Sequence, residues 1–405
     1  MKLLFVHQYL GAHGGAETDI NLTASEFQRR GHTAALLYEK GSQRNEDSWR
    51  ANFAECFQLA PTARVHHVQS LLKEFEPDAI YFHTLASLEL LEAFLGSGVP
   101  VVRRVHDHAM YCMRGYKYNY FTRAICTRPA SGHCVFPCLA FLGRGTGAWP
   151  IKWVSYAAKR KEIRLNQQCE ALIVYSQYQR AELIRNGFDP AQVHVHVPGS
   201  SLDNLGPVSS FSERNRVLFA GQIIRGKGVD LLLRALAKVR VPFECFILGD
   251  GNHRSRCERL CDSLGLSGRV HFAGFVRGPE LESYFLQSTV FAVSSVWPEP
   301  FGLVGHEAAR YGLPVVAFDA GGIREWLIDG ENGYLVNWMD TAAFAARIEE
   351  LLRNKDLARQ MGQRGRERVQ RQYSSSRFDP LEKIFLRVVA QAQNNIHESS
   401  FTLVS

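Results

Sequence analysis

The chain has 405 residues, 46% hydrophobic and 21% charged, which predicts two globular domains rather than one. No apolar run approaches the roughly 20 residues of a membrane span, and the apolar stretch before His7 is too short for a signal peptide. Nine cysteines, an odd number without such a signal, favour a reducing cytoplasm over a disulfide framework.

The net charge of +7 is unevenly distributed along the chain. Between Val101 and Leu165, twelve Lys or Arg accompany two acidic residues, so this segment carries +10 and the rest of the chain −3. A local basic excess attracts phosphate-bearing or acidic-lipid partners. From Lys159 onward, a solvated basic helix face explains the charge equally well. Nucleic-acid binding is the weakest interpretation, because no recognised motif accompanies the charge.

Short apolar runs alternate with helical stretches in two series. We expect the strands of the first series at 2–6, 33–38, 79–83, 99–105 and 171–175, with a helix at 18–30. A Gly-, Pro- and Ser-rich linker follows at 198–213. The second series has strands at 216–219, 243–248, 270–272, 290–294 and 314–318, followed by helices at 341–353, 357–371 and 377–392.

Continuous apolar strands separated by helices indicate parallel sheets covered on both faces. The sequence therefore predicts an α/β protein with two doubly wound, Rossmann-like domains that face each other across a cleft. We expect an N-terminal domain at 1–205, a C-terminal domain at 206–375, and a last helix within 376–405 that packs back on the first domain. Ligands of such sheets bind at the carboxyl ends of the strands.

Two motifs follow strands of the first domain. Gly14 and Gly15 stand between the first strand and its helix, where backbone N–H groups can approach a phosphate, although paired glycines are often only a turn. His106 and Asp107 follow the strand at 99–105. A lone histidine at a strand end is more often structural, but its position here favours function.

Two stronger motifs follow strands of the second domain. Arg225 and Lys227 share a glycine-containing loop, and two cations on such a loop suit a diphosphate. Glu299 and Glu307 flank the start of a helix expected near Gly302, in the sequence PEPFGLVGHE. The two carboxylates would then reach different parts of one ligand. Hydroxyl groups of that ligand would offset the desolvation cost of burying the carboxylates.

With these motifs the chain resembles glycosyltransferase family 4, also called glycosyl transferases group 1, most densely between Val217 and Val336. The family has the GT-B fold. The resemblance implies a retaining, hexosyltransferase-type enzyme that moves a sugar from a nucleotide-sugar, either a UDP- or a GDP-sugar, to an acceptor in polysaccharide, glycolipid or glycoconjugate biosynthesis.

The resemblance also implies a role for each motif. Glu299 would contact the transferred sugar, and Glu307 the ribose. His106 would lie against the donor sugar near the anomeric carbon. The remaining implied contacts are with the phosphates, through Arg225, Lys227, Gly14, Gly15 and the backbone of Phe301, Gly302 and Leu303, and with the nucleobase, through the backbone of Gly274, Phe275 and Val276. Glu325 is either a further donor contact or the cap of a short helix.

The sequence contains no D-x-D triplet, the carboxylate motif that commonly holds a divalent metal on a nucleotide-sugar. We therefore expect no metal and no cofactor, with leaving-group charge stabilised by Arg225, Lys227 and helix N-termini. By resemblance, the acceptor attacks on the face from which the phosphate departs. A nucleotide-sugar 2-epimerase of the same fold and an inactive nucleotide-sugar-binding module remain alternatives, whereas a phosphorylase would need a pyridoxal-binding lysine and a longer chain.

The stretch from His106 to Trp149 carries most of the basic excess and the aromatic run Tyr116 to Phe121, so we expect it to bind a sugar, lipid-linked or otherwise anionic acceptor. The run from Trp149 to Lys161 suggests either an interfacial helix, which would put the cytoplasmic protein in contact with the inner face of an anionic membrane, or a packed helix with a basic outer face. Four cysteines of this region are either a structural metal site or reduced thiols: Cys112, Cys126, Cys134 and Cys138.

Overall fold

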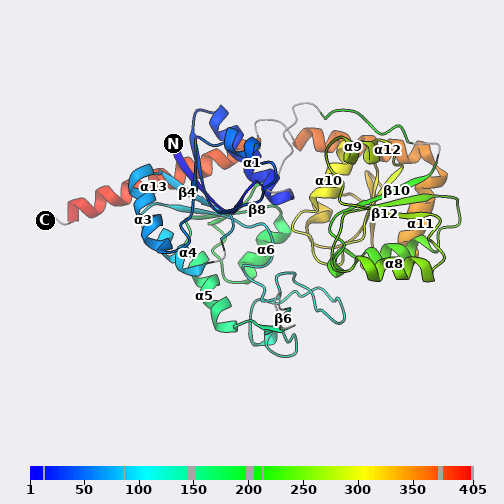
Figure 1. Cartoon of the computed structure of the whole chain (residues 1–405), viewed down its shortest axis with the longest axis horizontal. Helices are drawn as coiled ribbons and strands as arrows, with labels where there is room; N and C mark the ends of the chain where they lie inside the picture. Colours follow the sequence, from blue (N-terminus) through cyan, green and yellow to red (C-terminus); the bar gives the residue numbers. More distant parts are fainter. Residues whose placement is uncertain are drawn as a thin grey trace. The chain divides into compact units, whose positions relative to one another are not determined.

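The computed structural model describes residues 1–11, 14–85, 87–144, 151–197, 205–211, 214–372 and 377–402. The chain forms two compact units. Unit 1 contains Met1–Gly115, Thr127–Ser201 and Ser375–Ser405, and unit 2 contains Tyr116–Cys126 and Leu202–Ser374. Each unit has its own parallel sheet with helices on both faces (Figure 1). The predicted α/β fold with two doubly wound domains is therefore confirmed.

The sheet of unit 1 has seven parallel strands in the order β3-β2-β1-β4-β5-β8-β9. The inner strand β1 places Phe5 opposite Leu36 of β2 and Tyr81 of β4. Two of these strands, β3 and β9, were not predicted, because Glu55–Gln58 has only two apolar residues and Val193–Val195 is only three residues long. The strands are β1 Lys2–Leu10, β2 Thr33–Gly41, β3 Glu55–Gln58, β4 Ala79–Phe82, β5 Val101–Arg104, β8 Ala171–Val174 and β9 Val193–Val195.

Alternate residues of these strands enter the apolar cores on the two faces of the sheet, as expected for a sheet covered on both faces. One face packs against α1 and α13, whereas the other packs against α3 and α4 and, at β8 and β9, against α5 and α6. Serines begin α4, α5 and α6, each with a hydroxyl that accepts an N–H of the first turn. The helices are α1 Gly15–Arg29, α2 Glu46–Ala51, α3 Arg64–Phe75, α4 Leu88–Leu95, α5 Tyr156–Asn166, α6 Gln177–Arg185 and α13 Phe378–Thr402.

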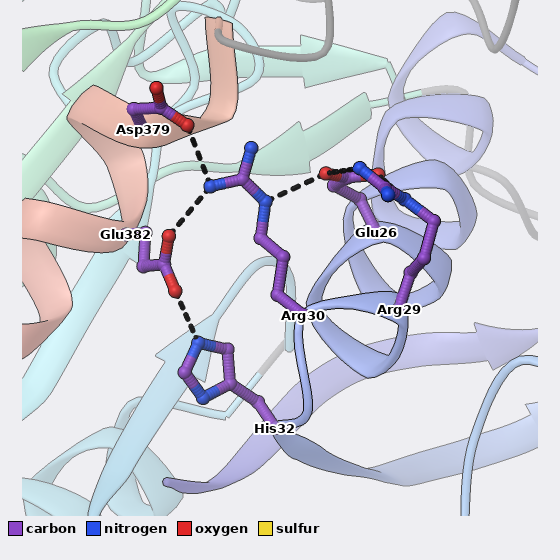
Figure 2. A network of polar contacts seen from close by, with 6 residues as sticks. All are labelled: Glu26, Arg29, Arg30, His32, Asp379 and Glu382. Atoms are coloured by element: carbon purple, nitrogen blue, oxygen red, sulfur yellow. Dashed lines mark hydrogen bonds and ion pairs between the residues drawn. The ribbon is translucent and has the colours of Figure 1, made fainter.

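The C-terminal helix α13 belongs to unit 1 although it follows unit 2 in the chain. Its Phe385 packs on Phe27 of α1 and on Tyr81 of β4, with ring centroids 5.5 and 5.0 Å apart. Figure 2 shows the polar contacts that accompany this packing, in which Glu382 accepts from Arg30 at 2.6 Å and contacts His32 at 2.7 Å. Apolar and ionic contacts together attach the end of the chain to the first sheet.

The sheet of unit 2 repeats the same order with six parallel strands, β12-β11-β10-β13-β14-β15. One face is covered by α7, α8, α11 and α12. On the other face, Phe285 of α9 stacks on Phe291 of β13 and on Tyr311, which follows α10. The strands are β10 Arg216–Ala220, β11 Glu244–Leu248, β12 Val270–Gly274, β13 Val290–Val293, β14 Val315–Phe318 and β15 Gly333–Val336. The helices are α7 Val229–Leu236, α8 Arg254–Ser263, α9 Gly278–Leu286, α10 Leu303–Arg310, α11 Thr341–Arg353 and α12 Lys355–Gln372.

Two expectations from the sequence need correction. The segment Tyr116–Cys126 was placed in the first domain, but its contacts assign it to unit 2. The helix expected from Trp149 to Lys161 begins only at Tyr156, because Ile151–Trp153 forms strand β7, which pairs with β6 at Leu142–Arg144. Trp149 itself, and the linker residues 198–204 and 212–213, lie outside the described residues.

Candidate active site

The cationic loop of unit 2 lies at the carboxyl end of β10. Arg225–Lys227 forms a single 3-10 turn directly before α7. Gly228 ends this turn with φ +65°, and a Cβ atom there would lie 2.0 Å from the carbonyl oxygen of Ser294. Only glycine therefore allows the loop to pack this closely against the end of β13. The Ser294 hydroxyl donates to the carbonyl of Lys227 at 2.9 Å, which further ties the two loops together.

Lys227 and Glu299 are brought into direct contact by this packing. Lys227 Nζ lies 2.6 Å from Glu299 Oε1, and the Ser295 hydroxyl donates to the same oxygen at 2.5 Å. The side chains of Lys227 and Glu299 are 20% and 6% exposed. The ammonium group also lies 5.1 Å from the Trp297 ring. The two groups assigned from the sequence to the diphosphate and to the sugar thus neutralise each other in this structure.

Glu299 is held in place by the loop that follows β14. Its backbone N–H donates to Ala320 at 3.2 Å, and its carbonyl accepts from Gly322 at 2.8 Å. This loop continues into the 3-10 turn Gly322–Glu325. Trp326, directly after the turn, donates through its indole N–H to the carbonyl of Phe301 at 2.6 Å. Backbone contacts therefore fix Glu299 at the carboxyl edge of the sheet.

Helix α10 begins where the sequence predicted it. Gly302 is the N-cap residue with φ +85°, a conformation that favours glycine, and Leu303 starts the helix. The positive end of the helix dipole thus lies directly after the loop that carries Glu299. Glu307 is half-buried on this helix, and desolvation raises the pKa of its carboxyl, opposed by the nearby Arg310.

Arg225 lies against residues from the Tyr116–Cys126 segment. Its guanidinium carbon is 5.1 Å from the centre of the Tyr120 ring, and its Nη2 donates to the carbonyl of Phe121 at 3.4 Å. Its Nε is buried and has no hydrogen-bond partner within the part of the chain that the structure describes. An unpaired buried donor is costly, and the described residues offer this atom no acceptor.

The segment proposed for the nucleobase lies at the end of β12. Gly274 ends the strand with φ +75°, and its carbonyl accepts from Gly249 at 2.6 Å. Phe275 is 55% exposed, and Val276 is buried. This segment, the Arg225 loop and the start of α10 all follow carboxyl ends of strands of one sheet, which is where doubly wound domains bind ligands.

In unit 1, His106 follows β5 and belongs to a buried polar network. Its Nε2 lies 3.0 Å from His83 Nδ1, and its Nδ1 lies 2.6 Å from the Tyr175 hydroxyl. Arg104, fully buried, forms an ion pair with Asp19 at 2.9 Å and lies over the Tyr175 ring. Burial lowers the pKa of His106 well below its usual range, and the positive charge of Arg104 lowers it further. His106 is therefore a neutral imidazole with both nitrogens engaged.

The glycine motif of unit 1 begins helix α1. Gly14 is the extended N-cap residue, and Gly15 is the first helical residue. The first turn also contains Glu17, whose carboxylate lies 3.8 Å from His7 Nε2. An acidic side chain stabilises a helix N-terminus but competes with a bound phosphate for it. The phosphate roles of Gly14 and Gly15 stay predictions, as do the individual ligand roles of the other site residues.

The structure adds residues that the motif analysis missed. Ser295 and Trp326 position the Glu299 loop, and Tyr175 and His83 engage His106. A signal existed for Tyr175 and His83, because each directly follows a buried apolar strand. Asp19 gave no such signal, since it lies within α1 and meets the network only through tertiary packing.

Two further observations concern the predicted metal site and membrane contact. Cys112, Cys126, Cys134 and Cys138 are all partly buried, and no group of three or more His, Cys, Asp or Glu among the described residues is arranged to hold a metal ion. Within the same residues, no helix combines the length and apolar character that a bilayer crossing needs.

Family models match both halves of the chain. The model described as Glycosyltransferase Family 4 matches residues 13–203, and the model described as Glycosyl transferases group 1 matches residues 205–368. Among curated relatives, the lipopolysaccharide core biosynthesis glycosyltransferase LpsE of Rhizobium meliloti is 34% identical over 39% of this chain and 45% of its own length.

A GDP-mannose-dependent alpha-(1-6)-phosphatidylinositol monomannoside mannosyltransferase of Mycolicibacterium smegmatis is 28% identical over 54% of this chain and 61% of its own length. The chain thus spans about half the length of the curated relatives that it matches. The crystal structure of Anabaena HepE in complex with UDP and glucose superimposes with a TM-score of 0.70 at 20% identity, over 98% of this chain and all of that chain. The chain belongs to the family 4, group 1 glycosyltransferases and has their GT-B fold.

Proposed function

We propose that this protein transfers a sugar from a nucleotide-sugar to an acceptor with retention of anomeric configuration. The observation that carries the proposal is the contact between Lys227 and Glu299 directly before α10, with Arg225 on the same turn as Lys227, at the carboxyl edge of one sheet. Two cations and a helix dipole suit the charge of a departing diphosphate. The carboxylate, released from Lys227, suits the hydroxyl groups of a sugar.

The donor in this proposal is a UDP- or GDP-sugar. HepE was crystallised with UDP-glucose, and the mycobacterial relative is named as GDP-mannose-dependent. The acceptor in this proposal is an anionic or lipid-linked sugar, supported by the basic excess between Val101 and Leu165 and by the relative named for lipopolysaccharide core biosynthesis. Such an acceptor would bring the protein to the inner face of a membrane.

In the proposed reaction the acceptor oxygen attacks the anomeric carbon from the face that the phosphate leaves. The carbon–oxygen bond to the phosphate breaks as the bond to the acceptor forms, and the departing phosphate takes the acceptor proton. His106 is not proposed as the base, because its two ring nitrogens already contact His83 and Tyr175. Burial also keeps this imidazole neutral.

The test is a panel of UDP-, GDP-, ADP- and TDP-sugars, incubated with the full-length protein with and without phosphorylated or lipid-linked sugar acceptors. We expect one donor to be consumed faster with acceptor, and NMR of the product to show the anomeric configuration of that donor. An inverted product would refute retention. Conversion of a UDP-sugar to its 2-epimer without acceptor would instead identify an epimerase, and tight nucleotide binding without turnover would identify a binding module.

A further inference from the structure

The segment Tyr116–Cys126 comes from the first half of the chain but is part of unit 2. It forms a short hairpin, in which Tyr118 and Ile125 make an antiparallel bridge. The backbone N–H of Arg123 donates to the carbonyl of Asn119 at 2.8 Å and closes the turn. We call Tyr116–Cys126 the aromatic hairpin, because three tyrosines and a phenylalanine occupy its first six positions.

An ion pair anchors the aromatic hairpin to helix α7. Arg123 Nη2 lies 2.8 Å from Asp230 Oδ2, and the two side chains are only 6% and 16% exposed. Asp230 lies in the first turn of α7, three residues after Lys227. Removing one partner of a buried pair leaves an uncompensated charge, so this contact holds the hairpin firmly beside the cationic loop.

The anchored hairpin lies directly against the Arg225 loop. A Cβ atom on Gly226 would lie 3.3 Å from the Tyr118 ring, so the absence of a side chain at Gly226 permits this approach. The Tyr120 ring lies 5.1 Å from the Arg225 guanidinium carbon, and the Phe121 carbonyl accepts from Arg225 Nη2 at 3.4 Å. One aromatic face and one carbonyl thus restrain the guanidinium, whereas its buried Nε lacks a partner among the described residues.

We propose that Arg123 is a positioning residue that acts through the aromatic hairpin: by holding the hairpin on Asp230, it orients the Arg225 guanidinium toward the diphosphate of the donor. A free arginine side chain loses rotamer entropy when it is fixed. Stacking on Tyr120 restricts the side chain before the ligand arrives, which raises affinity through preorganisation. This inference rests on the proposed function, because it assumes that Arg225 binds phosphate.

The experiment compares a nucleoside diphosphate with its monophosphate. Calorimetry on the full-length protein measures UDP against UMP and GDP against GMP, and the base that binds wild type more tightly is used throughout. We expect Arg123→Ala to weaken diphosphate binding by about fivefold to tenfold and monophosphate binding by less than about twofold. In an Arg225→Ala background, Arg123→Ala should change diphosphate affinity by less than about twofold, because the residue that it positions is absent.

Three further variants separate positioning from a general effect on folding. Arg123→Lys keeps a charge for Asp230 and should recover most of the lost affinity. Tyr120→Ala, at a ring that is 46% exposed, should show the same selective loss even if Arg123→Ala does not fold. Arg347→Ala is the matched control, because it removes an arginine that pairs with Glu350 on α11, and it should leave both affinities unchanged.

The outcomes distinguish the inference from the proposed function. If Arg225→Ala itself leaves diphosphate affinity unchanged, the phosphate assignment in the proposed function is wrong. If Arg225→Ala weakens the diphosphate but neither Arg123→Ala nor Tyr120→Ala does, the positioning role alone is overturned. Equal losses for mono- and diphosphate, or losses that add fully to that of Arg225→Ala, overturn it as well.

Discussion

Replacing Glu299 by glutamine should tighten the binding of a nucleoside diphosphate while it slows sugar transfer. In this structure, Lys227 Nζ lies 2.6 Å from Glu299 Oε1. A diphosphate that recruits Lys227 must therefore weaken this contact. Glutamine keeps the shape of the side chain and a hydrogen-bond acceptor for Ser295, but it removes the negative charge that competes with phosphate for the ammonium group.

The size of the effect follows from the exposure of the pair. A charge-assisted hydrogen bond contributes about 1.5–3 kcal/mol. Because the Lys227 side chain is 20% exposed, water replaces part of this contact when it breaks. We therefore expect the contact to cost the wild-type protein about 1 kcal/mol of diphosphate-binding free energy, a cost that Glu299→Gln removes. That corresponds to roughly fivefold tighter binding of the diphosphate. Transfer should fall by about 100-fold, because the sugar loses a contact that is formed as charge develops.

The assay is calorimetric titration with UDP and GDP, together with initial rates for the preferred donor. Glu307→Gln is the comparison variant. Because Glu307 is assigned to the nucleotide, its replacement should weaken nucleotide binding about tenfold. Weaker diphosphate binding in Glu299→Gln, or equal losses in the two variants, would refute the reasoning.

Lys227→Ala should weaken diphosphate binding and also lower the free energy of unfolding by about 2 kcal/mol. It leaves the carboxylate of Glu299, which is 6% exposed, without its counter-ion.

Three further predictions concern metal, acid and packing. Transfer should survive EDTA, and complete loss restored by magnesium or manganese would refute metal independence. Burial lowers the pKa of His7 to about 4 and the pKa values of His83 and His106 well below the usual range, so the unfolded chain binds more protons than the folded chain below pH 6.5. The stability that neutral imidazoles contribute is therefore present above pH 6.5 and is lost as pH falls, by about 1 kcal/mol for each histidine at pH 5.5. Denaturant unfolding at pH 7.5 and pH 5.5 measures this loss. An unfolding midpoint that does not change with pH would contradict the prediction. Gly305→Ala places a Cβ atom 2.5 Å from the Trp326 ring. We therefore expect the free energy of unfolding to fall by about 1–3 kcal/mol and nucleotide binding to weaken. A variant with unchanged stability and affinity would contradict this packing.

Local patterns in the sequence were enough to predict the fold class and the elements that carry the motifs. Buried parallel strands are continuous apolar runs, so most strands of both sheets were predicted within one to four residues. The start of α10 after Gly302 was predicted as well, because glycine and proline terminate and initiate helices by local geometry. The motifs then followed the carboxyl ends of strands, as the topology of a doubly wound sheet requires.

Only the tertiary structure decided which side chains meet. The sequence assigned Lys227 and Glu299 to different parts of one ligand, but the loops after β10 and β13 pack so closely that the two form an ion pair. It also placed Tyr116–Cys126 in the first domain, whereas the pair between Arg123 and Asp230, 107 residues apart in the chain, belongs to unit 2. Hydrophobic periodicity reports on neighbours within one element, but contacts between loops depend on long-range packing, which leaves no periodic signal in the sequence.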